Sequence, residues 1–537
     1  MNNLDPHNSA VFTDLLTALC QPACYPHHPD HVELVQTHIS AVFLAGDEVY
    51  KLKKPVRFSF LDYSTLQLRH HYCEEEVRLN RRLAPTVYLG VAPVLRIGNE
   101  YRVREAVNMR DAVVVDYLVR MRRLPPERTL AALLTAERIG KEDIQVLAKR
   151  LVHFHQSAAT KDAAMYGAPE VVWQALADNF SETASFIGDT ISQKQYSCIQ
   201  DFSRRFFEDY QDLLTRRILH DRIREGHGDL RCDHVYFLDQ GIEMIDCIEF
   251  SPRLRTCDVA SELAFLAMDL ELRGAPTVAA DLVHEYVVQA DDAELLPLLP
   301  FYQCYRAYVR GKVESLKSRE PEISPTEQDR ACWQARRAFR LAYRYARGPL
   351  APSLLVVCGR VGTGKSTVAQ LLSAHTGFAV HNSDVVRKRL AGLPPTAHAN
   401  DEYRSGIYSE DFSRKTYAAL QTQAEETLRN GRGVIIDATC KQREDRHSFL
   451  ALGERLGIPV LFVECRASLT EVERRLRERE KRGDSASDAT VDIARQQESD
   501  FPSFDDLPAS RHWAIDTESD LDEALVPVEE ALVVVNH

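Results

Sequence analysis

Hydrophobic and polar positions divide the first 125 residues into short strands and one helix. Two short apolar runs meet at Gly46-Asp47 within AVFLAGDEVYKLKK (41–54), a pattern typical of a hairpin. GVAPVLRIGNEYRVREA (90–106) predicts a second hairpin, and DAVVVDYLVRM (111–121) predicts a buried strand. Residues 64–83 begin with Ser, place apolar residues at helical spacing and contain neither Gly nor Pro, so they predict a helix.

The pattern becomes mostly helical from residue 129 to residue 346. Two strand-like pieces, HVYFLD (234–239) and GIEMIDCIEF (241–250), interrupt it. The next segment, RGPLAPS (347–353), contains two Pro and one Gly and predicts a linker. Beyond this linker, strands and helices alternate to the end of the chain.

The length of 537 residues exceeds what one hydrophobic core usually organises. We therefore predict a multidomain protein in which an α+β domain (1–346) and an α/β domain with a parallel sheet (354–537) are joined by the linker 347–353.

Composition narrows the possible partners. A net charge of −13 opposes generic binding to duplex nucleic acid or to anionic membranes. No apolar run approaches the roughly 18–20 residues that span a bilayer, and the acidic N-terminus does not resemble a signal peptide. Twelve scattered Cys without a Cys-x-x-Cys pair predict a reduced, cytoplasmic location. The sequence predicts no particular oligomeric state.

The segment GRVGTGKST fits the phosphate-binding pattern G-x-x-x-x-G-K-[ST]. An apolar strand, LLVVC, precedes it and a helical segment follows, which is the context that the motif requires. Such a loop wraps backbone N–H groups around phosphates, its Lys neutralises them, and its Ser binds Mg²⁺. The predicted ATP-binding residues are Gly359, Gly362, Thr363, Gly364, Lys365, Ser366 and Thr367, with Ser366 also on Mg²⁺.

Further polar residues follow the predicted strands of this domain. Asp384 and Arg387 lie one helical turn apart, so a carboxylate can take a proton from an acceptor hydroxyl beside a cation that holds an anionic group. Asp437 ends the buried strand GVIID, where a carboxylate reaches Mg²⁺ through water. A basic helix, ERRLREREKRG (473–483), is expected to bring Arg477 and Arg479 to the phosphates.

These motifs resemble the small P-loop kinases of the zeta-toxin, gluconate-kinase and polynucleotide 5′-hydroxyl kinase type. The resemblance covers roughly the last 185 residues. It implies that Asp384 is the general base toward a substrate hydroxyl, with Arg387 and Lys365 in the catalytic set. Arg387, Arg443 and Arg446 are candidates for anchoring the acceptor.

The segment HGDLRCDHVYF (227–237) contains the H-x-D core of a phosphotransferase loop. Upstream, Lys51 and Lys53 share one face of a predicted strand, because side chains alternate with period two. The predicted helix after them carries three consecutive Glu, and we expect Glu76 to pair with one of the two lysines. Downstream, Asp246 ends a strand-like piece.

The order of these elements resembles the aminoglycoside phosphotransferase and protein-kinase-like fold over roughly the first 345 residues, and hence a bilobal domain. The resemblance implies that Asp229 orients the substrate hydroxyl, that Arg231 lies near the γ-phosphate and that Asp246 binds Mg²⁺. It also implies that Lys51, Lys53 and Glu76 form the nucleotide site. The whole chain resembles a bacterial fusion of two kinase-type modules.

Two departures from that fold concern its phosphate and metal sites. His234 stands where a kinase has a metal-binding Asn, and it is expected either to weaken one Mg²⁺ site or to orient Asp229 without touching metal. No glycine-rich loop precedes Lys51, so Thr37, His38 and Ser40 would have to cover the phosphates.

The sequence thus favours an enzyme that transfers the γ-phosphate of ATP, with Mg²⁺, to a hydroxyl of a small metabolite or of a nucleic-acid end. One alternative is a P-loop kinase regulated by an N-terminal pseudokinase. Another is a nucleotide-gated interaction protein without an acceptor substrate.

Overall fold

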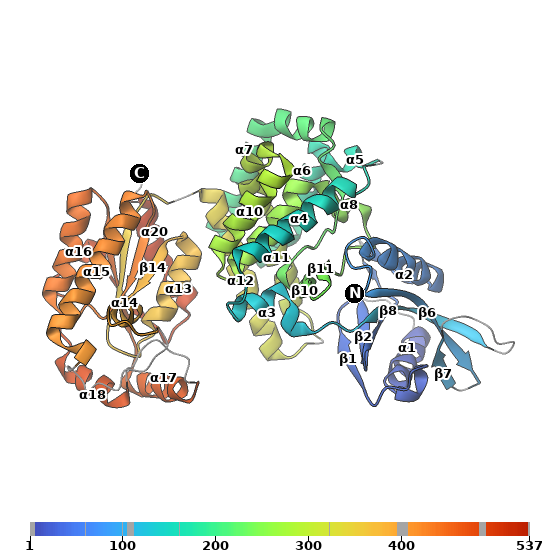
Figure 1. The fold of residues 1–537 in the computed structure, drawn as a ribbon, viewed down its shortest axis with the longest axis horizontal. Helices are drawn as coiled ribbons and strands as arrows, with labels where there is room; N and C mark the ends of the chain where they lie inside the picture. Colours follow the sequence, from blue (N-terminus) through green and yellow to red (C-terminus); the bar gives the residue numbers. More distant parts are fainter. Residues whose placement is uncertain are drawn as a thin grey trace. The chain divides into compact units, whose positions relative to one another are not determined.

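The computed structural model describes residues 6–58, 61–98, 100–104, 112–160, 162–321, 323–348, 350–394, 406–482 and 490–534. The chain forms two compact units, Met1–Ala346 and Arg347–His537 (Figure 1). Helix α12 (Pro325–Arg347) ends at the first residue of the predicted linker, and Ser353 at the far end of that linker is buried. Within the described residues, no helix combines the length and hydropathy needed to cross a membrane.

The first unit begins with a six-stranded antiparallel sheet in the order β1-β2-β3-β8-β6-β7. Its strands are β1 (Val32–Gln36), β2 (Ser40–Ala45), β3 (Glu48–Lys53), β6 (Tyr88–Ile97), β7 (Glu100–Val103) and β8 (Val113–Arg122). Helix α2 (Leu66–Asn80) packs on β8 and β6, and Thr65 accepts the Leu68 N–H as its N-cap. Both predicted hairpins, the central strand and the helix between them are confirmed.

A helical layer follows, built around α9 (Val259–Leu272). Every residue of α9 from Val259 to Leu270 is buried, and α10 and α11 pack on it. A helix that is enclosed all round belongs to the interior of its domain. The other helices of this unit are α1 (Pro6–Leu19), α3 (Leu130–Thr135), α4 (Lys141–Ser157), α5 (Ala164–Gly167), α6 (Pro169–Thr183), α7 (Gln193–Leu219), α8 (Pro252–Arg255), α10 (Pro276–Ala290), α11 (Leu299–Ser318) and α12.

Three two-stranded ribbons complete the first unit. They pair β4 (Arg57–Phe58) with β5 (Leu61–Asp62), β9 (Ile223–Glu225) with β12 (Thr256–Asp258), and β10 (Val235–Leu238) with β11 (Gly241–Met244). The segment 227–234 lies between β9 and β10, so the phosphotransferase-like loop connects two ribbons of the helical layer.

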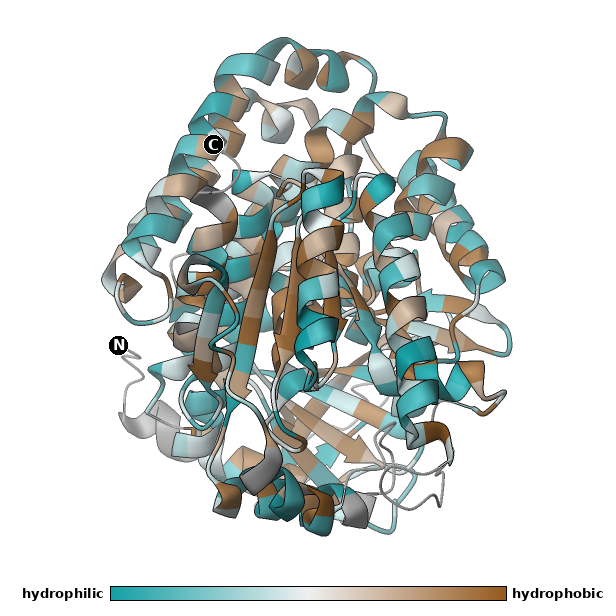
Figure 2. Ribbon diagram, turned by 90° about the vertical axis from the view of Figure 1, so that its left-hand side faces the viewer, coloured by the Kyte–Doolittle hydropathy of each residue, from teal (hydrophilic) through white to brown (hydrophobic). Residues whose placement is uncertain are grey.

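The second unit is a parallel sheet in the order β14-β15-β13-β16-β17, with helices on both faces. Alternate residues of β13 point to opposite faces: Val356 packs toward α15 and α16, and Val357 toward α13 and α20. The central strands β13, β15 and β16 are therefore hydrophobic along most of their length, between helices with hydrophilic outer sides (Figure 2). The predicted α/β domain with a parallel sheet is confirmed for this unit.

The strands of this sheet are β13 (Leu354–Cys358), β14 (Ala379–Asn382), β15 (Val434–Asp437), β16 (Val460–Arg466) and β17 (His512–Asp516). The helices are α13 (Lys365–Thr376), α14 (Ser383–Leu390), α15 (Glu410–Arg429), α16 (Arg443–Leu456), α17 (Leu469–Arg482), α18 (Val491–Asp500), α19 (Leu521–Ala524) and α20 (Val526–Val534).

Candidate functional site

The loop between β13 and α13 is shaped by glycines in the left-handed region. Gly359 has φ +128°, and a Cβ there would stand 2.6 Å from the carbonyl oxygen of Cys465. Gly362 has φ +74°, and its Cβ would stand 2.7 Å from Val472. Only glycine combines a positive φ with the absence of a Cβ, so the backbone can close tightly into the first turn of α13. Lys365 Nζ donates to the carbonyl of Arg360 at 2.7 Å, which folds the ammonium over this loop.

A carboxylate from the neighbouring strand lies beside the loop. Asp437 ends β15, which pairs with both β13 and β14, and its side chain is 3% exposed. Asn382 Nδ2 donates to Asp437 Oδ2 at 2.6 Å, while Asn382 Oδ1 accepts the N–H groups of Asp384 and Val385. One amide thus fixes Asp437 and caps α14. Sequence reasoning missed Asn382, although an Asn directly before a helical segment is an N-cap pattern.

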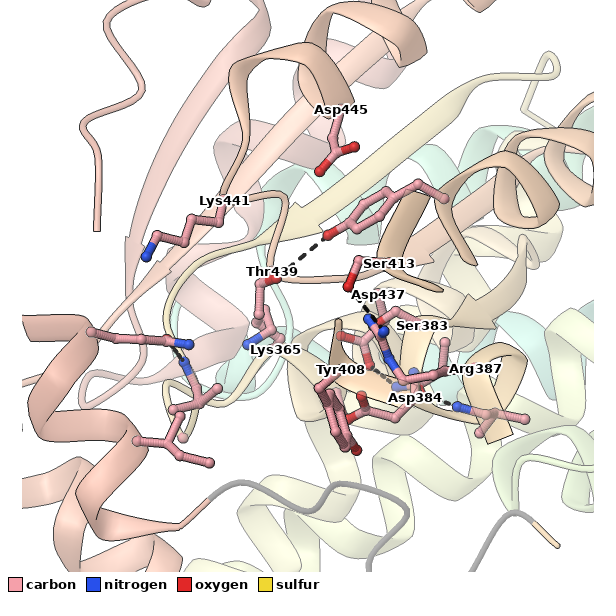
Figure 3. Close-up of a pocket in the computed structure, with 18 of the residues that line it drawn as sticks. Lys365, Ser383, Asp384, Arg387, Tyr408, Ser413, Asp437, Thr439, Lys441 and Asp445 are labelled. Atoms are coloured by element: carbon pink, nitrogen blue, oxygen red, sulfur yellow. Dashed lines mark hydrogen bonds between the residues drawn. The ribbon is translucent and has the colours of Figure 1, made fainter. Parts of the chain in front are cut away.

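Arg387 is 7% exposed and held in place by the turn Gly406–Tyr408 and by α15. Its NH1 donates to the carbonyl of Ile407 at 2.8 Å and to Ser413 Oγ at 3.1 Å. Its guanidinium carbon lies 4.9 Å from the centre of the Tyr408 ring, a cation–π contact. Arg387, Asp384 and Tyr408 lie together in Figure 3.

These groups line one cavity of about 1010 Å³. Its volume lies at the upper end of the range for small-molecule sites. Of the residues predicted from the sequence, the cavity is lined by Gly362, Gly364, Lys365, Ser366, Thr367, Asp384, Arg387, Asp437 and Arg479.

Gly359 and Thr363 do not line the cavity. Gly359 packs against the backbone of Cys465, and Thr363 is fully buried with its hydroxyl donating to the carbonyl of Arg360 at 2.8 Å. Both residues therefore support the conformation of the loop without facing the cavity.

The basic helix α17 brings one of its two predicted arginines, Arg479, to the cavity. Arg477 is not among the cavity-lining residues, and its guanidinium pairs with Glu473 on the exposed side of the helix. Arg479 lines the cavity, and so does Arg475, which was not predicted and which donates to Thr517 at 2.7–3.0 Å. The helical period explains the difference, because residues four apart share a face and a residue midway between them faces away.

The cavity contains a carboxylate that sequence reasoning missed, Asp445 on the first turn of α16. Burial raises the pKa of Asp445 from 3.8 to about 6, and the neighbouring Glu444 charge adds to the effect. Lys441 and Thr439 come from the loop before α16 and line the same cavity (Figure 3).

The predicted acceptor anchor Arg446 has a structural role instead. It is 2% exposed, donates from Nε to Asp506 at 3.0 Å and from NH1 to the carbonyls of Cys440 and Lys441 at 3.0 Å. Arg443 contacts His447 on the exposed side of α16 and does not line the cavity. The sequence could not separate these roles, because all three arginines lie in short helical segments that follow strands, and the spacing does not show which side chains face the cavity.

The first unit brings its predicted lysines and glutamate together. Lys51 Nζ lies 2.9 Å from Glu76 Oε1, and Lys53 Nζ lies 2.6 Å from Glu76 Oε2. Burial disfavours the charge of Glu76, but the two lysines outweigh it and hold the pKa of this carboxyl below its usual value. Lys53 also pairs with Glu249. The side chain of Lys53 is fully buried, whereas that of Lys51 is 15% exposed.

Asp246 joins this group from the segment after β11. Its Oδ1 lies 2.8 Å from Lys51 Nζ, and its backbone has φ +68°, which is uncommon for a non-glycine residue. Such backbone conformations cluster at functional sites. We call Lys51, Glu76, Asp229, His234 and Asp246 the N-terminal site.

The segment 227–234 is held by hydrogen bonds of the two histidines. His227 is fully buried, which lowers its pKa to about 4; its Nε2 donates to the carbonyl of Ile245 at 2.8 Å. His234 Nδ1 lies 2.9 Å from the carbonyl oxygen of Asp229. Arg231 Nε lies 3.1 Å from both carboxylate oxygens of Asp229, so it pairs with the predicted catalytic carboxylate.

Two carboxylates of α9 hold the backbone of this segment at its ends. Glu262 accepts the N–H of His227 at 2.7 Å, and Asp269 accepts the N–H of Cys232 at 2.9 Å. Both side chains are almost fully buried, and seven residues separate them, so they lie on one face of the helix two turns apart.

The turn between β1 and β2 contains the residues expected to cover the phosphates. The Ser40 N–H donates to Thr37 Oγ1 at 3.0 Å, and His38 pairs with Glu320. The Thr37 hydroxyl is therefore engaged in closing this turn.

Across the described residues, no group of three or more His, Cys, Asp or Glu side chains converges as a protein-only metal site would. Cations bound with nucleotides need fewer protein ligands, since phosphates supply the rest. Ser366 and Asp437 in one unit, and Asp246 and His234 in the other, have the donor atoms for such a role.

The parallel sheet, the glycine loop and the strand-end carboxylate define the second unit as a P-loop nucleotide-binding domain. A family model described as "AAA domain" matches residues 354–503, a little more than a quarter of the chain. The chain is also 29% identical over 464 residues to uncharacterized proteins of Mycobacterium tuberculosis and Mycobacterium bovis, which covers 86% of this chain and 89% of each relative.

Among solved structures, a gluconokinase from Sinorhizobium meliloti matches 34% of this chain and 94% of its own, with 18% identity and a TM-score of 0.26. The Mycobacterium tuberculosis APS kinase, in complex with AMPPNP and APS, matches 34% of this chain and 99% of its own, with 20% identity and a TM-score of 0.26. Both matches are confined to about a third of this chain.

Proposed function

We propose that the second unit is an ATP-dependent phosphotransferase that acts on a hydroxyl group. The observation that carries this proposal is the shared cavity, which the phosphate loop, Asp437, Asp384 and Arg387 all line. Phosphoryl transfer depends on positioning and charge neutralisation, and this cavity supplies both.

Each group has a distinct role in this proposal. Backbone N–H groups of the loop and Lys365 bind the β- and γ-phosphates, and Arg479 adds charge from α17. Ser366 and Asp437 would hold Mg²⁺, which neutralises phosphate charge when bound. Asp384 accepts the proton of the attacking hydroxyl, and the buried Arg387 positions an anionic part of the acceptor.

We further propose that the first unit is a second kinase-type module of the aminoglycoside phosphotransferase type. The supporting observation is the contact of Lys51 with both Glu76 and Asp246, the arrangement that protein kinases use to place ATP phosphates and metal. In this proposal Asp229 orients a second acceptor hydroxyl, and Arg231 shifts from Asp229 to phosphate when nucleotide binds.

The deciding experiment screens hydroxyl acceptors, both small metabolites and 5′-hydroxyl oligonucleotides, with radiolabelled ATP. The intact chain is compared with Lys365→Ala, Asp384→Asn and Asp229→Asn. Loss of labelling in Lys365→Ala and Asp384→Asn supports the P-loop activity, and loss in Asp229→Asn supports the first module.

Two other outcomes have clear meanings. If Asp229→Asn has no effect on any transfer while nucleotide still binds the first unit, that unit is a regulatory pseudokinase. If no acceptor is labelled by the intact chain although ATP binds, the protein is a nucleotide-gated interaction protein.

A further inference from the structure

His234 lies between Asp229 and Asp246, two of the three carboxylate residues of the N-terminal site. Its Nδ1 lies 2.9 Å from the carbonyl oxygen of Asp229, and its Nε2 lies 3.9 Å from Oδ2 of Asp246. The other oxygen of Asp246, Oδ1, contacts Lys51. The two oxygens of Asp246 are therefore divided between the lysine and the imidazole.

The hydrogen-bond partners of His234 assign its tautomer. The carbonyl of Asp229 can only accept, so Nδ1 carries the proton of the neutral ring. Arg231 NH2 lies 3.1 Å from Nε2 and can only donate, so Nε2 presents its lone pair. That lone pair stands on the side of the ring nearer to Asp246 Oδ2.

This imidazole offers the same two functions as the Asn of a kinase loop. An Asn side chain combines an N–H donor with a carbonyl oxygen, and in kinases that residue binds the second Mg²⁺. His234 donates to the loop backbone from Nδ1 and offers a lone pair from Nε2. A histidine that binds a metal through one ring nitrogen commonly donates the N–H of its other ring nitrogen to a carbonyl. Only the element of the ligand atom changes, from oxygen to nitrogen.

The distances allow one cation to touch both groups. Two ligand bonds of about 2.1 Å each can span at most about 4.2 Å, and His234 Nε2 and Asp246 Oδ2 are 3.9 Å apart. Arg231 would have to leave Nε2, and it keeps a partner in Asp229 when it does so.

We propose that His234 and Asp246, together with nucleotide phosphate, form a metal site that prefers Mn²⁺ to Mg²⁺. Mg²⁺ favours hard oxygen ligands, whereas first-row transition cations accept imidazole nitrogen. This inference rests on the proposed nucleotide site of the first unit. It specifies the metal that accompanies the nucleotide there, in contrast to the all-oxygen pair Ser366 and Asp437 of the second unit.

The direct test detects the nitrogen ligand. The full chain carrying Lys365→Ala is mixed with Mn²⁺ and adenylyl imidodiphosphate, and pulsed electron paramagnetic resonance measures the ¹⁴N coupling to Mn²⁺. Among the residues that the structure describes, none that lines the cavity of the second unit is a histidine, so these residues give no imidazole coupling to Mn²⁺ bound there. We expect a ¹⁴N signal from an imidazole bound directly to Mn²⁺. In protein labelled with ¹⁵N-histidine, which leaves the site chemically unchanged, this signal should become a ¹⁵N signal. In His234→Asn it should disappear.

The second measurement compares metal preference. Calorimetry gives the nucleotide affinity with Mn²⁺ and with Mg²⁺ for the parent chain, for His234→Asn and for a control, His153→Asn, on the exposed face of α4. We expect the Mn²⁺ to Mg²⁺ affinity ratio to fall roughly tenfold in His234→Asn, the change for one ligand interaction of about 1.4 kcal/mol, and to stay unchanged in the control.

The two proposals fail in different ways. Absence of Lys51-dependent nucleotide binding with either metal overturns the proposed function of the first unit, and this inference with it. The metal inference alone is overturned if nucleotide binding requires Lys51 but the parent chain shows no histidine nitrogen coupling to Mn²⁺, and if His234→Asn has the same Mn²⁺ to Mg²⁺ affinity ratio as the parent chain.

Discussion

Asp445 is a carboxylate whose charge is disfavoured in the folded protein, and its replacement by Asn should stabilise the second unit. Raising the pKa from 3.8 to about 6 corresponds to about 3 kcal/mol at 1.36 kcal/mol per pKa unit. The side chain is partly exposed, so solvent screening reduces the expected gain in Asp445→Asn to about 1–2 kcal/mol at pH 7.5. For a unit of this size that gain raises the melting temperature by roughly 2–8 °C.

The pH dependence of this gain follows from the direction of the shift. The folded state holds the proton of Asp445 more tightly than the unfolded state, so stability falls as pH rises from about 4 through 6. Above pH 6 the cost is fully present, and at pH 4.5 only about a third of it is. Asp445→Asn should therefore gain most at pH 7.5 and about a third as much at pH 4.5.

Scanning calorimetry of the wild type and Asp445→Asn at pH 4.5, 6.0 and 7.5 checks this prediction. Glu454→Gln, an exposed position on the same helix, removes one negative charge without the burial and serves as the control. An equal gain at all three pH values, or a gain no larger than that of the control at pH 7.5, would refute the reasoning. A carboxylate retained at such a cost in a cavity is typical of a functional site.

Three further predictions concern charged groups. Glu76→Gln removes the partner of both Lys51 and Lys53 and should destabilise the first unit by about 3–5 kcal/mol in urea unfolding; a loss below 1 kcal/mol would contradict a buried pair. Arg479→Ala should lower kcat/KM for ATP roughly 10²-fold, as for loss of one charge-stabilising group, while Arg477→Ala stays within twofold; equal effects would remove the distinction between the two helix faces. Arg446→Ala should cost the second unit about 3–5 kcal/mol, because it leaves the Asp506 carboxylate without its buried partner; a change confined to KM for the acceptor, with unfolding unaltered, would restore Arg446 as an anchor.

Local periodicity accounts for what the sequence predicted well. Hairpins, the parallel-sheet domain and the glycine loop follow from patterns within about 15 residues. The pairing of Glu76 with a strand lysine was also predictable, because Lys51 and Lys53 share a face of β3. Which lysine pairs was left open, and the structure uses both, since each carboxylate oxygen takes one.

The remaining site features depend on contacts between distant segments. The orientation of Arg477 away from the cavity follows from the phase of α17, which is set by packing of Val472 and Leu476. The burial of Arg446 depends on Asp506, sixty residues further along the chain, and the raised pKa of Asp445 depends on what covers it. No local pattern contains this information.

Helix α9 connects the stability of the first unit with the segment 227–234, which contains Asp229. The same 14 residues carry the centre of the hydrophobic core on their apolar positions and anchor both ends of the segment 227–232 through Glu262 and Asp269. The loop therefore moves as part of the helical layer and has little freedom to adjust separately. Substitutions that repack α9 should displace Asp229 before they unfold the unit, so under the proposed function selection on catalysis and selection on folding act on the same helix.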